Sequence, residues 1–438
     1  MNPSIVDLKG VGKSFSSADG APRTVLDNVD FTLREREIVA LLGQSGSGKS
    51  TLLRIMAGLV MADRGDVTYR GQPLYGPARG ISMVFQSFAL FPWLTVQQNV
   101  EIGLEAQGVP AAEREARAEK VIDLIGLSGF EGALPRELSG GMRQRVGIAR
   151  ALVVDPDVLL MDEAFSALDV LTGERLRDDS LELWEKHQIS TKAILVVSHN
   201  IQEAIMMADR VLIFASDPGR VRYEMRVDLP RPRDADSDEV RTLVDEIYAV
   251  MTAGRIRAGK TTEEVEPMRL DTRLPDADIG LMEGLLERLM EDPFQGHADL
   301  PQLGDETELT DEELLPAAEA LELLEFAMLA SGDVSVTDLG KRYVAAEYDE
   351  RQALFATQLL KRVPLAAHIQ HSLLQEPTGE LKEEHFLDML RETLDKEEAE
   401  RVLNVAIGWG RHGEVYSYNY TTGMIQLPEA DESETAAT

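Results

Sequence analysis

Eight consecutive residues have the spacing of a phosphate-binding loop. They are Gly43-Gln44-Ser45-Gly46-Ser47-Gly48-Lys49-Ser50, and Thr51 follows them. An apolar segment precedes this loop and a helical pattern follows it, which is the context that the motif requires. Glycines let backbone N–H groups face a phosphate, and a helix N-terminus adds partial positive charge. We expect Lys49 to reach the β- and γ-phosphates of a nucleotide, Ser50 to bind Mg²⁺ and Thr51 to contact the α-phosphate.

Polar residues that suit phosphoryl transfer end three other apolar segments. Asp162 and Glu163 end one, His199 ends the next, and Gln86 follows an earlier one. We expect Asp162 to hold Mg²⁺ and Glu163 to orient and deprotonate the attacking water. Gln86 would ligate the metal and sense the γ-phosphate, which His199 would also contact. Taken singly, the acidic pair could merely cap a helix, the histidine could be structural and the glutamine could be a surface residue.

A second glycine-rich segment also precedes a helical pattern. It is Leu138-Ser139-Gly140-Gly141-Met142-Arg143-Gln144-Arg145. Its backbone amides would form another anion site. One chain needs one such site for its own nucleotide, so the second is expected to serve a phosphate held by another subunit. Phe15, after the first predicted strand, could stack on adenine, although a core role for it stays open.

Taken in their order along the chain, the motifs resemble the nucleotide-binding domain of ATP-binding cassette (ABC) ATPases over residues 5–250. That order is Phe15, Gly43–Thr51, Gln86, Leu138–Arg145, Asp162-Glu163, Ser166–Asp169 and His199. The resemblance implies ATP and Mg²⁺ as cofactors, ATP hydrolysis as the activity and a head-to-tail dimer, expected to be a homodimer. It implies that the signature residues act on the ATP of the partner subunit; they are Ser139, Gly140, Gly141 and Gln144. Asp169, in Ser166-Ala167-Leu168-Asp169, would organise the dimer seam.

Three further segments resemble the nitrate, taurine and aliphatic-sulfonate group of ABC importers. They are Phe91-Pro92-Trp93-Leu94-Thr95-Val96 with Asn99, Asp217-Pro218-Gly219-Arg220 and Leu229-Pro230-Arg231-Pro232-Arg233-Asp234. The resemblance implies a subunit that couples dimer closure on ATP to solute import through a separate membrane permease, with an external solute-binding protein involved indirectly. Phe88, Phe91, Pro92 and Trp93 would form a groove for a permease helix, or else pack within the subdomain. The alternative is a soluble ATP-gated regulatory protein that acts through its C-terminal part.

Length and composition set the broad class. A chain of 438 residues should form two or three domains. No segment approaches 18 apolar residues and no secretory signal is evident, so we expect a cytoplasmic protein, peripheral on the inner face of the membrane. Cysteine is absent, which excludes disulfides and cysteine-based chemistry. The net charge of −33 is concentrated in residues 261–438, which carry −27 and should repel nucleic acid.

Apolar runs typical of buried parallel strands alternate with helical patterns in the N-terminal half. We therefore expect an α/β fold, a P-loop NTPase cassette of the ABC type at 1–253, with a mostly parallel sheet and a helical subdomain near 87–155. Strands are predicted at 4–9, 36–42, 158–161, 194–197, 210–215 and 220–227, and helices at 49–59, within 97–126, at 142–153 and at 238–253.

The remainder is predicted to be a linker at 254–275, a mostly helical domain at 276–427 and a disordered acidic tail at 428–438. Helical patterns are found at 279–291, 311–324, 336–346, 348–362, 364–375, 382–394 and 396–409, with hairpin patterns at 326–336 and 415–427. Helices followed by a hairpin, twice, predict two winged-helix-like units. The segment resembles the AAA-associated C-terminal domain, and we expect it to serve protein contact, regulation or dimer stabilisation. His368, His371 and His385 could suggest a metal site, but their neighbours favour a solvated face.

Overall fold

The computed structural model describes residues 2–16, 22–43, 46–165, 168, 170–215, 218–252, 270, 272–394 and 396–428. Its chain forms two compact units. The N-terminal unit comprises Met1–Ser14 and Thr24–Val244, and the C-terminal unit comprises Phe15–Arg23 and Asp245–Thr438. Within the described ranges, no helix is both long and apolar enough to cross a membrane. Most of the predicted linker and nearly all of the predicted tail lie outside the described residues.

A six-stranded sheet in the order β10-β9-β3-β8-β7-β6 forms the centre of the N-terminal unit. Every strand pair is parallel except β9 with β10, which is antiparallel. All residues of β3, β7 and β8 are buried, which is why their sequences are nearly continuous apolar runs. The strands are β3 (Glu37–Leu42), β6 (Ile81–Val84), β7 (Val158–Asp162), β8 (Ala193–Val197), β9 (Arg210–Ala215) and β10 (Arg220–Arg226).

A four-stranded sheet in the order β2-β1-β4-β5 accompanies the central sheet. One hydrophobic cluster joins residues of β1, β2, α1 and the parallel strands, so burial of their apolar side chains holds these layers together. The additional elements are β1 (Ser4–Ser16), β2 (Pro22–Arg34), β4 (Arg64–Tyr69), β5 (Gln72–Pro73), α1 (Lys49–Met56), α5 (Val170–Glu185) and α6 (Ile201–Met207). Helix α7 (Asp238–Thr252) begins in this unit and continues, from Asp245, in the C-terminal unit.

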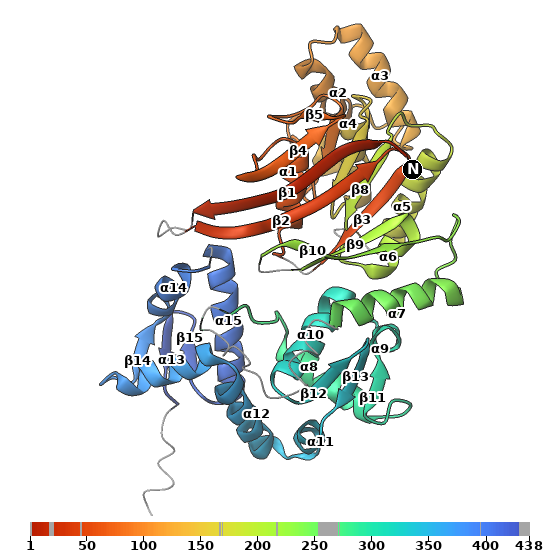
Figure 1. The fold of residues 1–438 in the computed structure, drawn as a ribbon. Helices are drawn as coiled ribbons and strands as arrows, with labels where there is room; N and C mark the ends of the chain where they lie inside the picture. The colour runs from red at the N-terminus through yellow and green to blue at the C-terminus, as the bar shows by residue number, and fades with distance from the viewer. Residues whose placement is uncertain are drawn as a thin grey trace, which may run out of the picture. The chain divides into compact units, whose positions relative to one another are not determined.

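Three helices form a subdomain with a core of its own. They are α2 (Val96–Ala106), α3 (Ala111–Leu124) and α4 (Gly140–Leu152), and a 3₁₀ turn, Pro135–Glu137, leads to α4. Figure 1 shows α3 projecting beyond the two sheets at the top of the view. The helical stretch predicted within 97–126 is divided because Gly108 has a φ of 77° and Pro110 follows it.

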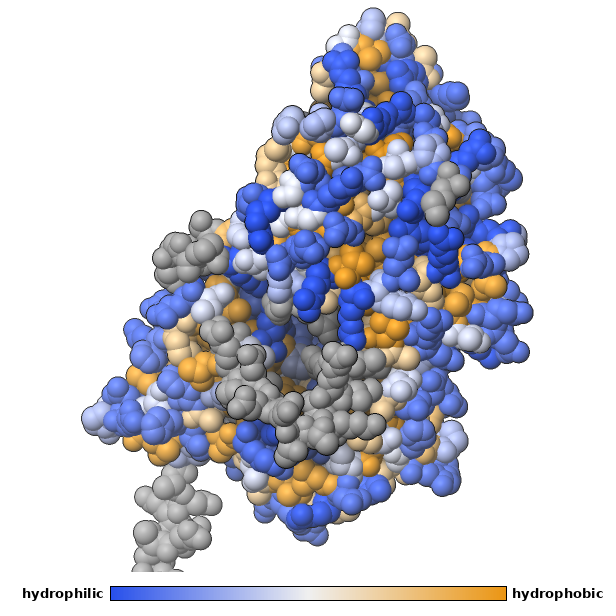
Figure 2. All heavy atoms as spheres, in the orientation of Figure 1, coloured by the Kyte–Doolittle hydropathy of each residue, from blue (hydrophilic) through white to orange (hydrophobic). Residues whose placement is uncertain are grey.

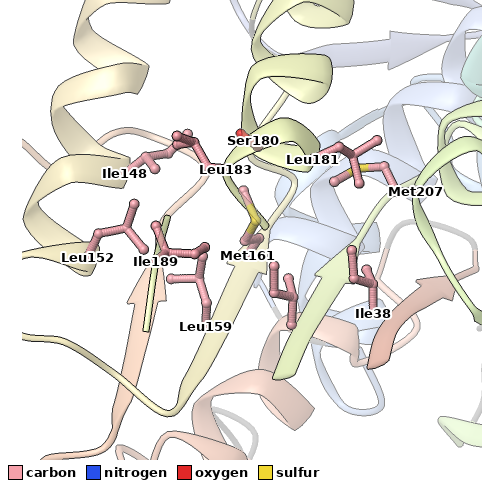
Figure 3. Close-up of a pocket in the computed structure, with 11 residues that line it drawn as sticks. Ile38, Ile148, Leu152, Leu159, Met161, Ser180, Leu181, Leu183, Ile189 and Met207 are labelled. Atoms are coloured by element: carbon pink, nitrogen blue, oxygen red, sulfur yellow. The ribbon is translucent and has the colours of Figure 1, made fainter. Parts of the chain in front are cut away.

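A small apolar cavity of about 20 Å³ lies between the central sheet and helices α4 and α5. Figure 3 shows Ile148 and Leu152 from α4, Leu183 from α5 and Leu159 and Met161 from β7 around it. The hydroxyl of Ser180, the one polar side chain in the lining, donates to the carbonyl of Leu176. An apolar lining offers water too few partners, so the space is a packing defect rather than a polar site.

The C-terminal unit contains the same arrangement of elements twice. Each copy has the order helix, strand, helix, helix, strand, strand, and its first strand pairs with its last in a three-stranded antiparallel sheet. The first copy comprises α8 (Ile279–Met290), β11 (His297–Asp299), α9 (Leu300–Thr307), α10 (Asp311–Leu323), β12 (Ala327–Ala330) and β13 (Asp333–Val336). The second comprises α13 (Pro364–Gln375), β14 (Glu380–Lys382), α14 (Glu383–Arg391), α15 (Lys396–His412), β15 (Ser417–Asn419) and β16 (Met424–Gln426). This order is compatible with the winged-helix-like units, which stay a prediction.

Two helices, α11 (Asp338–Ala345) and α12 (Tyr348–Arg362), connect the copies. Aromatic rings of Phe326, Tyr343 and Phe355 pack at their junction, with centroids 4.5–6.4 Å apart. Trp409 of α15 is 1% exposed and donates through Nε1 to the carbonyl of Ala277. On the face shown in Figure 2, hydrophilic residues dominate and hydrophobic ones lie in small patches, as expected when the apolar side chains are drawn into cores.

Candidate functional site

The predicted phosphate loop connects β3 to α1. Gly46 and Gly48 have φ of 72° and 94°, and Gly48 is the N-cap of α1. A Cβ at Gly48 would lie 2.8 Å from Leu26 Cδ2, so both the backbone conformation and the available space require glycine there. Gln44 and Ser45, predicted to contact nucleotide, lie outside the described residues. The described part of the loop therefore directs the chain into a helix N-terminus, the local structure that the motif predicts.

Two buried polar side chains lie in this loop. Ser47 is 1% exposed, and its Oγ has no hydrogen-bond partner within the described residues. Lys49 is 5% exposed, and its Nζ donates to the carbonyl of Gly43 at 2.6 Å. An unsatisfied buried hydroxyl is costly, whereas phosphate oxygens can accept from it and from the lysine ammonium. These residues thus fit a bound polyphosphate, with Thr51 in the first turn of α1.

Asp162 ends β7 and is 5% exposed. The hydroxyl of Ser50 donates to Asp162 Oδ1 at 3.0 Å, so two hard oxygen donors from distant segments lie together. Burial raises the pKa of the Asp162 carboxyl, and the charge of Glu163 raises it further, against the hydrogen bond from Ser50. A cation beside a buried carboxylate would relieve that penalty. Hydroxyl and carboxylate oxygens are ligands that Mg²⁺ prefers, so this pair fits a magnesium ion.

Gln86, Glu163 and His199 converge from the ends of β6, β7 and β8. Gln86 Nε2 donates to Glu163 Oε2 at 2.6 Å, and His199 Nδ1 lies 4.0 Å from the same oxygen. These three strands are parallel neighbours, so their carboxyl ends meet at one edge of the sheet. Glu163 has a φ of 45°, and its N–H donates to the carbonyl of Val197. Such a strained backbone at a polar cluster is typical of functional sites.

The helix that follows His199 is fixed at both ends. Asn200 caps α6 by accepting a hydrogen bond from the N–H of Glu203 at 2.7 Å. Arg233 donates to the carbonyls of Ile205 and Ala208, the latter at 2.7 Å. Burial lowers the pKa of Arg233 to about 10, and the charge of nearby Arg231 contributes.

Arg231 completes this cap. Its Nε donates to the carbonyl of Met207 at 3.0 Å, and its guanidinium forms ion pairs with Asp209 and Glu185. The two arginines satisfy carbonyls that a helix C-terminus leaves without partners. The sequence suggested the segment 229–234 only as a family marker. The structure gives it a physical task, which is to hold the end of the helix that follows His199.

The second glycine-rich segment lies at the N-terminus of α4. Ser139 is the N-cap, and its Oγ accepts from the N–H of Met142 at 3.3 Å. A Cβ at Gly141 would lie 2.5 Å from Thr172 Cγ2 of α5, so a side chain there would require Thr172 to move. Gln144 is 0% exposed, and neither polar atom of its side chain has a partner within the described residues. Its action on another subunit's ATP stays a prediction, as do those of Ser139, Gly140 and Gly141.

The contacts described above do not include two of the predicted site residues, Asp169 and Phe15. Asp169, predicted at the dimer seam, lies outside the described residues, as do Ser166 and Ala167. Phe15 lies near the end of β1 and is 44% exposed, so it is not an ordinary core phenylalanine. Its contact with adenine stays a prediction.

The aromatic segment after Gln86 exposes one large apolar residue. Trp93 is 71% exposed, and its ring lies 5.6 Å from that of Phe91. Asn99, 0% exposed, donates to the carbonyls of Phe91, Leu94 and Thr95 and accepts from the N–H of Phe91. One buried amide therefore fixes the turn that presents Trp93, which explains why the two occur together in the sequence.

Comparisons with known proteins agree with these features. Residues 26–166 match the ABC transporter family, and residues 301–419 match the C-terminal AAA-associated domain. The chain is 42% identical over 244 residues to the nitrate import ATP-binding protein NrtD of Synechocystis, a match that covers 55% of this chain and 91% of that protein. It is 41% identical over 227 residues to the taurine import ATP-binding protein TauB of Pseudomonas syringae, covering 52% and 85%.

An uncharacterized ABC transporter ATP-binding protein of Methanocaldococcus jannaschii, MJ0412, is 45% identical over 214 residues, covering 49% of this chain and 79% of that protein. Among solved structures, a dimeric ATP-binding cassette with bound ADP and phosphate is 33% identical and covers 52% of this chain and 100% of that one, with a TM-score of 0.46. The loop, the strand-end cluster and relatives matched over most of their length lead to one conclusion: this chain belongs to the ATP-binding proteins of ABC transporters, which are ATPases.

Proposed function

We propose that this chain is the ATP-hydrolysing subunit of an importer of the nitrate, taurine and sulfonate group. It would work as a dimer on the inner face of the membrane and drive a separate permease. The observation that carries the proposal is the convergence of Gln86, Glu163 and His199 on one oxygen position beside the Ser50–Asp162 pair. The named import functions of the nitrate and taurine relatives support the transport role.

In this proposal, each strand end has a separate task in phosphoryl transfer. Glu163 orients the attacking water and accepts its proton. Gln86 donates to Glu163, which keeps that carboxylate at the edge of the sheet. His199 lies close enough to Glu163 to link the base to the γ-phosphate. The metal supplies neutralisation of phosphate charge when bound, and Ser50 and Asp162, with Gln86, would hold it.

A second subunit would complete the site. Ser139 and the glycines after it lie at a helix N-terminus, where backbone N–H groups favour an anion. Lys49 and Ser47 already serve the nucleotide of their own chain. The N-terminus of α4 is therefore available for the ATP of a partner, which would make hydrolysis depend on a dimer.

The exposed aromatic segment suits contact with the permease. Trp93 projects from a turn that buried Asn99 fixes, beside the half-buried ring of Phe91, so its exposure is not the result of a loose loop. Exposed apolar side chains on a rigid turn favour a protein partner. This turn follows Gln86 directly, so movement of one segment would be transmitted to the other.

Substitution Glu163→Gln tests the catalytic part of the proposal. The amide keeps the size of the side chain but cannot accept the proton of the attacking water. We expect ATP binding to persist while phosphate release falls about 10²-fold or more. Glu115→Gln, on the exposed face of α3, is the matched control and should hydrolyse ATP normally. Normal turnover in Glu163→Gln would remove Glu163 from the mechanism.

Purification from membranes tests the transport part. The full chain, expressed with its genomic neighbours, should co-purify with a multi-span protein, and Trp93→Glu should release it without loss of ATP binding. If the wild-type chain hydrolyses ATP but never recovers a membrane partner, the importer assignment is wrong although the ATPase assignment holds.

A further inference from the structure

The loop that carries Gln86 contains two consecutive residues with a left-handed backbone. Phe88 and Ala89 have φ of 58° and 45°. Neither is glycine, so this conformation is unfavourable unless other contacts hold it. The loop lies between Gln86, which donates to the proposed base, and the exposed aromatic turn. Something outside the loop must therefore stabilise its shape.

Arg150 on α4 makes the contacts that hold this backbone. Its Nη1 donates to the carbonyl of Ala89 at 2.6 Å and its Nη2 donates to the carbonyl of Phe88 at 2.8 Å. Burial lowers the pKa of Arg150, as expected for a guanidinium placed against carbonyls without a carboxylate partner in this contact. A guanidinium presents its N–H groups in a rigid planar fork that suits two adjacent carbonyls, a fixed geometry that a lysine ammonium lacks.

A second arginine of the same helix supports the loop from another side. The guanidinium of Arg143 lies 5.8 Å from the ring centroid of Phe88, and its Nη1 donates to the carbonyl of Leu138. Both arginines belong to α4, whose N-cap is Ser139. The helix that would bind a partner's ATP is thus attached to the loop that positions Gln86.

We propose that Arg150 is a positioning residue that holds the left-handed backbone at Phe88 and Ala89, and thereby couples the position of α4 to the placement of Gln86 on Glu163. The inference rests on the proposed function. Gln86 already meets Glu163 in this structure, so Arg150 acts by keeping the loop in the shape that allows this contact. Loss of the arginine would leave the loop free to relax to ordinary backbone angles.

The experiment uses the full chain and measures ATP turnover and the Mg²⁺ concentration that gives half-maximal turnover. We expect Arg150→Gln to lower turnover about tenfold or more and to raise the Mg²⁺ requirement, because supporting residues of a metal site typically have effects of this size. Gln86→Ala should have a similar effect. The double variant Arg150→Gln with Gln86→Ala should be no worse than Gln86→Ala, since both changes remove one function.

Rescue by glycine distinguishes positioning from general stability. Ala89→Gly adopts a positive φ without strain, so it should restore part of the turnover of Arg150→Gln. Arg150→Lys, which keeps the charge but lacks the rigid planar fork, should be intermediate. The matched control is Arg117→Gln, which removes a guanidinium bond to the carbonyl of Val153 at the C-terminus of α4 and should turn over normally.

Two results would overturn the inference. If the losses of turnover in the two single variants multiply in the double variant, Arg150 does not act through Gln86. If Ala89→Gly does not restore turnover to Arg150→Gln, backbone strain is not what Arg150 opposes. Should Arg150→Gln not fold, the comparison of Arg150→Lys with its Ala89→Gly double variant gives the same decision. A wild-type chain without ATP turnover would instead contradict the proposed function, so the two failures remain distinguishable.

Discussion

In the N-terminal unit, buried and half-buried acidic groups meet specific polar partners. Asp157 accepts from Tyr69 and forms ion pairs with Arg70 and Lys192 at 2.5 and 3.1 Å. In the C-terminal unit, Asp299 faces other carboxylates. Burial raises the pKa of Asp299, and the charges of Asp245, Asp333 and Asp305 raise it further. At these two positions, the N-terminal unit pairs a carboxylate with opposite charges, whereas the C-terminal unit places like charges near one another.

The difference extends to the backbone. In the N-terminal unit, left-handed non-glycine residues occur in connections, such as Arg36 and Arg70, and also in the proposed catalytic segments, at Glu163, Phe88 and Ala89. In the C-terminal unit they lie in connections next to helices and strands, such as Glu308 after α9 and Ser331 between β12 and β13. A strained backbone beside a polar cluster indicates a functional site, whereas a strained backbone in a turn allows the chain to reverse its direction. The comparison predicts that chemistry is confined to the N-terminal unit.

The largest effect on ATP hydrolysis should come from substitution of the lysine in the phosphate loop, compared with substitution of a lysine in the C-terminal unit. Lys49→Ala removes the buried ammonium of the phosphate loop, so we expect ATP hydrolysis to fall about 10²-fold or more. Lys361→Ala, on α12, removes an exposed ion pair with Glu325 and should leave hydrolysis unchanged. Phosphate-release assays compare them. A similar loss of hydrolysis in both variants would contradict the prediction that the chemistry is confined to the N-terminal unit.

Next in size is removal of the largest buried side chain of the C-terminal unit. Trp409→Ala would create a cavity and leave the carbonyl of Ala277 without its donor, which should cost about 3–5 kcal/mol. Amide hydrogen exchange should accelerate in α8 and α15. Equal acceleration in β3 and β8 would show that the two units share one folding transition.

Helix caps should give smaller and matched effects in both units. Thr95 closes a capping box with Gln98 at α2, and Thr310 closes one with Glu313 at α10. Each substitution to alanine should destabilise its own helix by about 1 kcal/mol. Exchange of the first amides of each helix measures this. An effect of Thr95→Ala much larger than that of Thr310→Ala would indicate that α2 has an additional task.

The smallest effects concern pH and have opposite signs. Burial opposes ionisation of Asp157, but its hydrogen bonds with Tyr69 and Lys192 and its pairing with Arg70 outweigh burial and lower its pKa below 3.8. Its stabilisation is therefore present above pH 3.8 and lost as pH falls through the lower folded value. Burial and the charge of Asp333 raise the pKa of Asp245 above 3.8, so acidification relieves a penalty there.

Asparagine variants test these signs. Asp157→Asn should lower the free energy of unfolding of its unit at pH 7, and Asp245→Asn should raise that of its unit slightly. Exchange protection at pH 7 and near pH 4 provides the measurement. The benefit of Asp245→Asn should shrink at the lower pH, and a benefit that grows instead would contradict the assigned like-charge repulsion.

Much of the fold follows from local patterns. The helices α12 and α13 have the limits predicted at 348–362 and 364–375, and β9 and β10 pair as predicted. The strands β11 and β14 have three residues each and were not predicted. They exist because β13 and β16, many residues later, supply their hydrogen bonds. No local pattern records such a partner.

The sequence by itself determined the phosphate loop, the acidic strand end at Asp162 and Glu163, and the family, because adjacent residues and fixed spacing specify them. Tertiary structure decided which side chains meet. It brought Gln86 to Glu163, placed Arg150 on the carbonyls of Phe88 and Ala89, and buried Gln144. An arginine in a helical pattern looks the same whether its guanidinium meets water or a strained loop. Only packing of distant segments makes that choice, since burial and hydrogen-bond partners are properties of the folded chain.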